Sequence, residues 1–191
     1  MRIDHIPEEF RIEWPVSKVE FEPEMAEIDW GPWNKTHMVA RHFYTDDWRF
    51  ESTWRVPVQN LQVVLKLKYV TAPDFSIWPG YSRRLVEWQL FRSRQICGFW
   101  QYNGVTAIPS LNWTGGMDVK VLSEGIPEDS VVAVRAPAKR YLNEWLEGAI
   151  KIRDRIKPKV VLHFGNLYGS EVWDRFYQMK LGQSGKPRKK L

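Results

Sequence analysis

The sequence contains one cysteine and no long hydrophobic run. A lone Cys97 permits neither an internal disulfide nor a cysteine-based zinc cluster. No stretch of about 18 consecutive apolar residues occurs, and the first nine residues lack the apolar segment of a signal peptide. We therefore expect a cytosolic protein. We also expect Cys97 to be a small buried residue of an apolar helix rather than a nucleophile.

The common sequence signatures of catalysis are absent as well. The chain has no GxxxxGK[ST] phosphate loop, no GxGxxG fingerprint, no HExxH zinc motif and no GxSxG nucleophile elbow. The pair Gly115-Gly116 lacks the spacing of a phosphate loop. Local motifs therefore assign no reaction, and they leave open whether the protein is an enzyme.

The composition is that of one globular domain with an unusual number of tryptophans. The 191 residues are 43% hydrophobic and include 11 Trp, so the chain is long enough to bury a core of its own. Large rings are most often core residues. Exposed rings instead form flat platforms for bases, sugars or partner proteins.

Charge is distributed unevenly along the chain. Residues 1–29 hold nine acids and three bases, whereas residues 30–191 hold fourteen acids and twenty-five bases. This asymmetry predicts contact with a polyanion such as nucleic acid. The alternative is that the acidic segment lies across a basic face of its own domain. The end of the sequence carries four basic side chains, Lys186, Arg188, Lys189 and Lys190. They would bind nucleic acid under the first interpretation and be solvated under the second.

Three regions follow from these patterns. Residues 1–36, with four prolines and many acids, are typical of an extended arm with an edge strand around Lys18–Phe21. Residues 37–181 form the α/β domain, and residues 182–191 form a basic tail.

Short apolar strands alternate with helices along the domain. Five strands are predicted, at residues 39–44, 67–74, 105–111, 131–135 and 159–164. Helices are predicted at residues 56–65, 80–103, 119–124, 138–157 and 170–180. Pro109 lies in the third strand, where a missing N–H interrupts the ladder.

This alternation is typical of a parallel sheet, since parallel neighbours need crossover connections. The predicted fold class is α/β, with about five mostly parallel strands alternating with helices. Five strands are too few for a closed eight-stranded barrel. The sheet is then either a shortened TIM-barrel-like curl or an open doubly wound sheet. We favour the curl because each strand is followed by its own helix in simple order.

In both architectures ligands bind at the carboxyl ends of the strands. The residues after the strands, together with one helix residue, are therefore the predicted ligand-binding set: Asp74, Ser76, Trp78, Arg92, Asn112, Trp113, Arg135, His163 and Tyr168. Two of them have simpler interpretations. Asp74 follows a proline and can cap a helix or turn, and His163 lies in an apolar strand, where a core histidine is the more common case.

A metal site is a weaker prediction from the same strand ends. Asp46, Asp47 and Asp74 could hold Mg²⁺ or Mn²⁺ if the fold brings them together. The simpler interpretation of Asp46-Asp47 is a solvated turn.

Arg92 breaks the pattern of its helix. On a helical projection it falls within the apolar half of residues 80–103, so its guanidinium must find a carboxylate or a ligand. We predict that Arg92 pairs with Asp74 or reaches an anionic ligand at the strand ends.

Four segments carry a family resemblance: PDFSIW (73–78), FRSRQICGFWQYNGVTAIPSLNW (91–113), GIPEDSVVAV (125–134) and IKPKVVLHFG (156–165). Together they resemble the family called domain of unknown function 4417, over roughly residues 35–168. The resemblance implies a bacteriophage, plasmid or other mobile element as the source, and the host cytoplasm as the location. It implies no catalytic residues.

Three functions remain open at this stage. The first is an accessory protein of a phage or mobile element that binds nucleic acid, a nucleotide or another anionic ligand at the strand ends. The second is an interaction protein that binds a host protein through exposed tryptophans. The third is a phosphoester hydrolase that depends on Mg²⁺ or Mn²⁺. We rank them in this order, and we expect no membrane partner.

Overall fold

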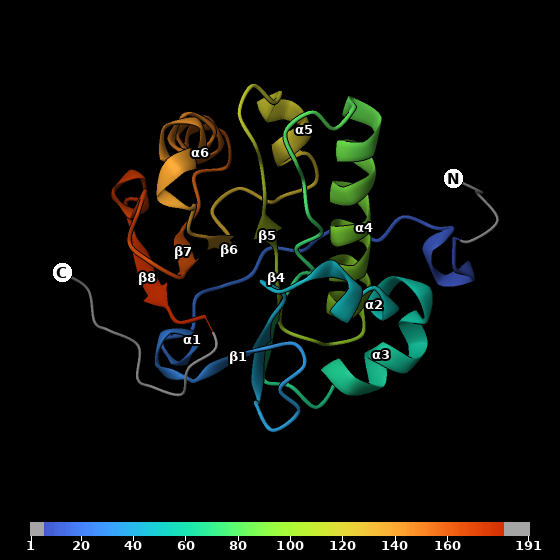
Figure 1. Ribbon diagram of the computed structural model, residues 1–191. Helices are drawn as coiled ribbons and strands as arrows, with labels where there is room; N and C mark the ends of the chain where they lie inside the picture. The colour runs from blue at the N-terminus through green and yellow to red at the C-terminus, as the bar shows by residue number, and fades with distance from the viewer. Residues whose placement is uncertain (1–5, 182–191) are drawn as a thin grey trace.

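The computed structural model describes residues 6–181 and has an α/β architecture (Figure 1). Eight short strands form two four-stranded sheets in this part of the chain, with orders β1-β2-β3-β4 and β5-β6-β7-β8, and every pairing is parallel. The strands are β1 (Trp30–Pro32), β2 (Ala40–His42), β3 (Tyr69–Thr71), β4 (Ala107–Ile108), β5 (Ser110–Leu111), β6 (Val131–Arg135), β7 (Val160–Phe164) and β8 (Phe176–Met179).

Helices cover the outer faces of both sheets. The α-helices are α1 (Glu24–Glu27), α2 (Ser52–Arg55), α3 (Pro57–Val64), α4 (Arg83–Tyr102), α5 (Val119–Ser123) and α6 (Leu142–Ile156). Short 3-10 turns are η2 (Glu8–Phe10), η3 (Asp47–Arg49), η4 (Lys139–Tyr141) and η5 (Ser170–Val172). No helix in the described part of the chain combines the length and apolar character needed to cross a bilayer.

The two sheets curl around one shared interior. Alternate side chains of β1, β2, β3, β4, β6, β7 and β8 form a single buried cluster, which runs from Trp30 to Met179. The Trp30 and Phe164 rings, from β1 and β7, meet edge to face with centroids 5.5 Å apart. The curl does not close, because β1 and β8 are not paired. Instead α1 lies against β8 beside this gap.

Pro109 divides the array into its two sheets. It stands between β4 and β5 and has no N–H to donate, so the ladder stops there. Its carbonyl still accepts a hydrogen bond from Ala133 N at 2.9 Å, which keeps β6 beside the break. The interruption expected from the sequence is thus confirmed.

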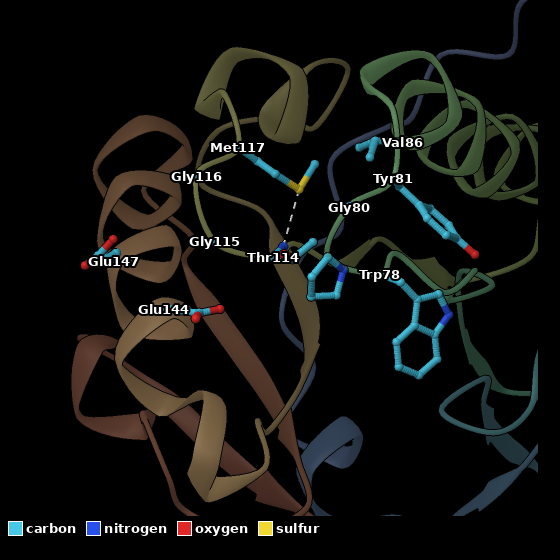
Figure 2. Close-up of a pocket in the computed structure, with 11 residues that line it drawn as sticks. Trp78, Gly80, Tyr81, Val86, Thr114, Gly115, Gly116, Met117, Glu144 and Glu147 are labelled. Carbon is cyan, nitrogen blue, oxygen red and sulfur yellow. Dashed lines mark hydrogen bonds between the residues drawn. The ribbon is translucent and has the colours of Figure 1, made fainter.

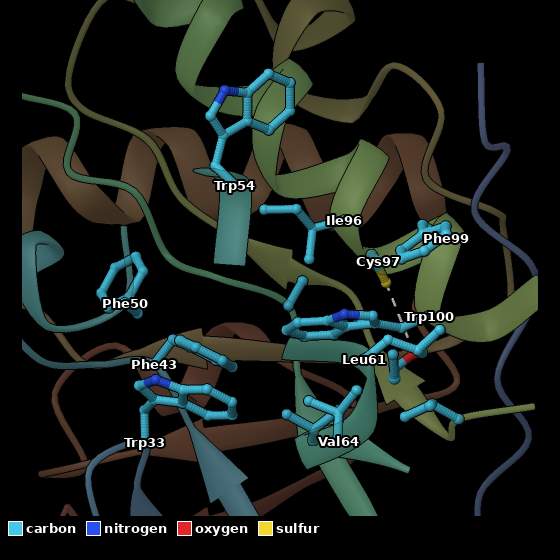
Figure 3. Packing of buried hydrophobic residues seen from close by; sticks show 14 of the residues in the cluster. Trp33, Phe43, Phe50, Trp54, Leu61, Val64, Ile96, Cys97, Phe99 and Trp100 are labelled. Atoms are coloured by element: carbon cyan, nitrogen blue, oxygen red, sulfur yellow. Dashed lines mark hydrogen bonds between the residues drawn. The ribbon is translucent and has the colours of Figure 1, made fainter. Parts of the chain in front are cut away.

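Strand residues alternate between the interior and the helices. In β6, Val131 and Ala133 belong to the interior cluster, whereas Val132 and Val134 pack under α5 and α6. The first sheet packs its outer face on α2, α3 and α4. Figure 3 shows the aromatic core of that layer, in which the fully buried Trp100 lies near Phe43 and Cys97. Cys97 is a buried helix residue, as expected, and burial raises the pKa of its thiol.

The acidic N-terminal segment binds the amino ends of the strands. Glu20 pairs with Lys159, 2.5 Å away and directly before β7. Glu24 pairs with Lys68, directly before β3, and Glu22 accepts from the Tyr69 hydroxyl at 2.5 Å. Glu20, Glu22 and Glu24 are therefore used within the molecule, which agrees with the second interpretation of the charge asymmetry for this part of the segment. The opposite ends of the strands are not covered by this segment.

A close backbone approach attaches the N-terminal segment to α4. A Cβ added at Gly98 would lie 2.3 Å from the carbonyl oxygen of Trp14, so only glycine fits there. Gln95 of the same helix accepts from Trp14 N at 2.7 Å and donates to Ile12 O at 2.9 Å. Phe10 is also a buried core residue, with its ring 4.6 Å from that of Trp54, so the N-terminal segment is built into the fold.

Several predictions about individual elements were wrong. The strand count is eight rather than five, because β1 and β8 were not anticipated and Pro109 splits one strand. Residues 170–180 are a 3-10 turn followed by β8, not a helix. Residues Lys18–Phe21 form no strand, although Val131 N donates to Val19 O at 2.9 Å. The α/β class, the parallel order and the absence of a closed barrel are confirmed.

Candidate functional site

A pocket of about 550 Å³ lies at the carboxyl ends of the strands. Its walls come from the segments that follow β3, β5, β6, β7 and β8, together with η4 and the first turn of α6. We call it the mouth pocket. Its volume is in the range of sites for small organic ligands, which usually occupy about 300–1,000 Å³.

Six of the nine predicted ligand-binding residues line this pocket. They are Asp74, Ser76, Trp78, Asn112, Trp113 and Arg135. They come from the carboxyl ends of β3, β5 and β6, which the curl of the sheets brings together. Arg92, His163 and Tyr168 do not line it.

The polar residues on the β3 and β5 side are held by hydrogen bonds. Ser76 donates to the Asp47 carboxylate through its backbone N–H, 3.0 Å from Oδ2, and through its hydroxyl, 2.8 Å from Oδ1. Asn112 donates from Nδ2 to Phe75 O at 3.0 Å. These side chains are therefore fixed before any ligand arrives.

Trp113 forms the apolar wall toward α6. Its indole N–H donates to Trp145 O at 2.9 Å, and the two indole rings lie 4.7 Å apart. Gly148 makes this approach possible, since a Cβ there would lie 2.3 Å from the Trp113 ring. The ring is buried, whereas Trp78 on the opposite side is 58% exposed.

A group of polar side chains adjoins the pocket, which two of its members, Asp74 and Arg135, line. Asp74 Oδ1, Tyr44 Oη and His42 Nε2 are buried and have no hydrogen-bond partner within the described residues. The His42 and Tyr44 rings stack 5.6 Å apart, and the Ser110 hydroxyl lies beside that of Tyr44. Arg135, at the end of β6, is close enough to influence the charge of all three. We call these five residues the floor cluster.

Burial controls the protonation of the floor cluster. It raises the pKa of Asp74 from 3.8 to about 7, against the opposing effect of the Arg135 charge. Burial lowers the pKa of His42 to about 4 and raises the pKa of Tyr44 well above its ordinary value. Within the floor cluster, only the Asp74 pKa is shifted to near neutral pH.

The rim of the pocket contains residues that the sequence analysis missed. Arg140 and Tyr141 lie in η4, with the guanidinium 4.7 Å from the ring centroid, and Glu144 follows in α6. The sequence predicts a helix that begins at residue 138, so Arg140 and Tyr141 were expected inside that helix. In the structure α6 begins at Leu142, and Arg140 and Tyr141 lie before it on the rim of the pocket. His42 and Tyr44 were missed because they belong to a predicted buried strand.

A second pocket of about 330 Å³ adjoins the mouth pocket (Figure 2). Trp78 and Glu144 are among the residues that line both pockets. Figure 2 shows Trp78 and Tyr81 on one side and Glu144 and Glu147 of α6 on the other, with the loop carrying Thr114 between them. The two pockets thus share a wall.

Arg92 has a structural explanation. Its Nη1 donates to Glu51 Oε1 at 2.8 Å, its Nη2 donates to Gln89 Oε1, and its guanidinium lies 3.7 Å from the Phe75 ring centroid. The predicted pairing with Asp74 is wrong, because Glu51 of the segment before α2 supplies the carboxylate. Burial lowers the pKa of Arg92 and the Glu51 charge raises it.

The two remaining candidates lie away from the pocket. His163 is fully buried on the outer side of β7, where Trp145 and Phe176 pack edge to face against it. Burial lowers its pKa to about 4, so it is neutral at physiological pH. Tyr168 is 41% exposed outside the pocket. The basic residues 186–190 lie outside the described residues.

The predicted metal triad is not assembled. Between residues 6 and 181, no group of three or more His, Cys, Asp or Glu side chains is arranged to hold a metal ion. Asp46 pairs with Arg49 at 3.2 Å, Asp47 accepts from Ser76, and Asp74 belongs to the floor cluster. The three carboxylates do not converge on one point, because Asp46 and Asp47 form the start of η3 and not an inward-facing strand end.

Residues 13–179 match the family described as domain of unknown function 4417, and the chain belongs to this family. It is similar to the Gene 1 protein of Mycobacterium phage D29, with 31% identity over 132 residues, and to the Gene 1 protein of Mycobacterium phage L5, with 32% identity. Each match covers 67% of this chain but only 49% and 58% of the two phage proteins. The chain thus spans about half of the curated relatives it matches. No solved structure matches it.

Proposed function

We propose that the protein binds a small anionic ligand of the nucleotide class in the mouth pocket. The observation that carries this proposal is Arg135. This arginine lines a cavity whose other lining residues include an exposed tryptophan, Trp78, and the hydrogen-bonded side chains of Ser76 and Asn112. Such a combination suits a phosphate and a flat ring in one molecule.

The two ends of the pocket differ in chemistry. Arg135 and Arg140 bring positive charge to the side formed by the segment after β6. Trp78 and Glu144 lie at the side shared with the second pocket. A phosphate paired with the arginines would leave the base near the Trp78 ring, where stacking stabilises any base.

The use of basic residues within the molecule favours a mononucleotide over a nucleic-acid strand as the ligand. The acidic N-terminal segment occupies Lys68 and Lys159 at the amino ends of the strands, which removes two cations from any extended basic face. The similarity to mycobacteriophage proteins supports the further proposal that this is an accessory protein of a phage or mobile element.

Calorimetric titration at pH 6 with AMP, GMP, CMP, UMP, ADP and orthophosphate tests the proposal. At least one nucleotide should bind at one site per chain. Arg135→Gln should weaken that binding at least about tenfold, since a charge-assisted hydrogen bond contributes about 1.5–3 kcal/mol. Trp78→Ala should weaken the binding of nucleotides more than the binding of orthophosphate, because only a nucleotide has a base that can stack on the indole ring.

Arg155→Gln is the matched control. Arg155 is an exposed arginine of α6 that pairs with Glu128 at 3.2 Å and does not line the pocket. Its loss should leave binding unchanged. Absence of binding to every compound, or equal binding by wild type and Arg135→Gln, would contradict the proposal. So would tight binding of a DNA strand without binding of any mononucleotide.

A further inference from the structure

We propose that Asp74 binds the ligand of the mouth pocket as a neutral carboxylic acid that donates a hydrogen bond, so that ligand binding and proton uptake are coupled. This inference rests on the proposed function, since it concerns the same ligand. In this inference Asp74 contacts the ligand directly and is protonated in the complex.

The geometry places an unsatisfied carboxyl at the base of an open site. Asp74 lines the mouth pocket and is half-buried as a residue, yet its Oδ1 is fully buried and has no partner. A buried polar atom without a partner is costly and uncommon in folded proteins. A ligand that contacts the part of Asp74 that lines the pocket would give this carboxyl group a hydrogen-bond partner.

The surroundings of Asp74 favour its neutral form. The charges that act on Asp74 are those of Asp47 in η3 and Arg135 at the end of β6, and Asp74 in turn acts on Tyr44, which follows β2. His42 at the end of β2 and Ser110 in β5 complete the floor cluster. Burial and the Asp47 carboxylate raise the pKa of Asp74, and Arg135 lowers it, with a result of about 7.

His42 and Tyr44 of the floor cluster keep constant charge near neutral pH. The His42 pKa of about 4 leaves that ring neutral, and the Tyr44 pKa lies well above 10. A change in binding between pH 6 and 9 is therefore assigned to Asp74 or to the ligand itself.

An anionic ligand increases the preference for the neutral acid. If Asp74 were ionised, a bound phosphate would bring its negative charge close to that of the carboxylate. The repulsion between these two charges costs free energy in a partly buried site. A phosphate oxygen next to protonated Asp74 instead accepts a hydrogen bond. A carboxylic acid held neutral by its site is a known way to donate a hydrogen bond at pH 7.

The test compares wild type with Asp74→Asn by calorimetry at pH 6, 7, 8 and 9. The probe is AMP, or the member of the nucleotide panel that binds more tightly. Wild-type affinity should fall about tenfold from pH 6 to pH 8 and about tenfold again to pH 9, as expected if only the protonated form binds. Titrations in two buffers of different ionisation enthalpy should show uptake of about half a proton at pH 7.

Asp74→Asn retains a donor and cannot ionise, so it should show only the pH dependence of AMP itself. The ratio of the two affinities therefore removes the contribution of the ligand phosphate. Asp74→Ala, also unable to ionise, replaces it if the asparagine variant does not fold. It should in addition bind several-fold more weakly than wild type at pH 6.

The outcomes separate the two proposals. Nucleotide binding with the same pH profile in wild type and variant would overturn the role of Asp74 and leave the proposed function standing. Absence of nucleotide binding at every pH would overturn the proposed function and this inference together. Stronger wild-type binding at pH 8 than at pH 6 would also exclude Asp74 as a donor.

Discussion

At the scale of single residues, burial decides what a charged side chain does in this protein. Glu51 forms ion pairs with two arginines of very different exposure. Arg92 is 2.8 Å away with 9% of its side chain exposed, and Arg55 is 3.8 Å away with 74% exposed. Only the first pair is shielded from water, so only the first should contribute substantially to stability.

Arg92→Gln should therefore lower the free energy of unfolding by about 2–4 kcal/mol, because it leaves Glu51 and the Phe75 surface without their partner. Arg55→Gln, the matched control on the same carboxylate, should change it by less than about 0.5 kcal/mol. Urea denaturation measures both. Equal effects of the two substitutions would show that burial does not distinguish the pairs.

Burial also limits how many tryptophans are available to a partner. All eleven lie in the described part of the chain, and only Trp48 and Trp78 are more than half exposed. A surface rich in tryptophan, on which binding to a host protein would depend, is thus reduced to these two rings. Trp78 is part of the mouth pocket, and Trp48 stacks with Arg49 at 4.3 Å.

At the scale of elements, local chemistry accounts well for the two long helices. Ser82 caps α4 by accepting from Leu85 N at 3.4 Å. Helix α6 ends where Lys157 takes the left-handed conformation, with φ of 45°, directly before a proline. Glycine is the usual residue for that position, because its backbone reaches positive φ without strain.

Lys157→Gly should accordingly raise the free energy of unfolding by about 0.5–1 kcal/mol. Lys151→Gly makes the same chemical change at an exposed position inside α6 and should lower it by about 1 kcal/mol. Thermal and urea unfolding measure both variants. A loss of stability in Lys157→Gly would show that the lysine side chain contributes more than the strain costs.

The edge strands show where local patterns fail. The aromatic residues Trp173, Phe176 and Tyr177 have helical spacing, yet Phe176–Met179 form β8 against β7. Phe176 packs under α6 and Tyr177 faces the interior, which is the alternation of a strand. Over four residues the two periodicities cannot be distinguished, and the unpaired edge of β7 selects the strand.

At the scale of the whole molecule, the Asp74 pKa links global stability to pH. The folded state retains a proton that the unfolded chain releases above its ordinary pKa of 3.8. The contribution of Asp74 to stability therefore falls as pH rises from about 4 to about 7 and is constant above that.

Asp74→Asn should remove this dependence. Above pH 7 the variant should be more stable than wild type by about 1–3 kcal/mol, which is below the full value of the shift because Asp74 is only half-buried. His42 and His163, whose lowered pKa values act in the opposite direction, are present in both proteins and cancel in the comparison. Urea denaturation from pH 4 to pH 9 measures the difference. Parallel stability curves would exclude a raised pKa at Asp74.

The sequence by itself determined the α/β class, the parallel order and the segments that form β2 to β7, and it predicted where a site would lie. These follow from hydrophobic periodicity and from the rule that parallel strands present their carboxyl ends together, so they need no knowledge of distant contacts. Six of the nine candidate residues reach one pocket for the same reason.

Only the tertiary structure decided the partner of Arg92, the separation of the three aspartates, the pairing of β1 and β8, and the floor cluster around Asp74. Each depends on residues far apart in the chain: Glu51 meets Arg92 across 41 positions, and Arg135 lies beside His42 and Tyr44 through the curl of the sheet. Local periodicity carries no information about such pairs. They are set by how the sheets curl and by which buried charge finds a partner.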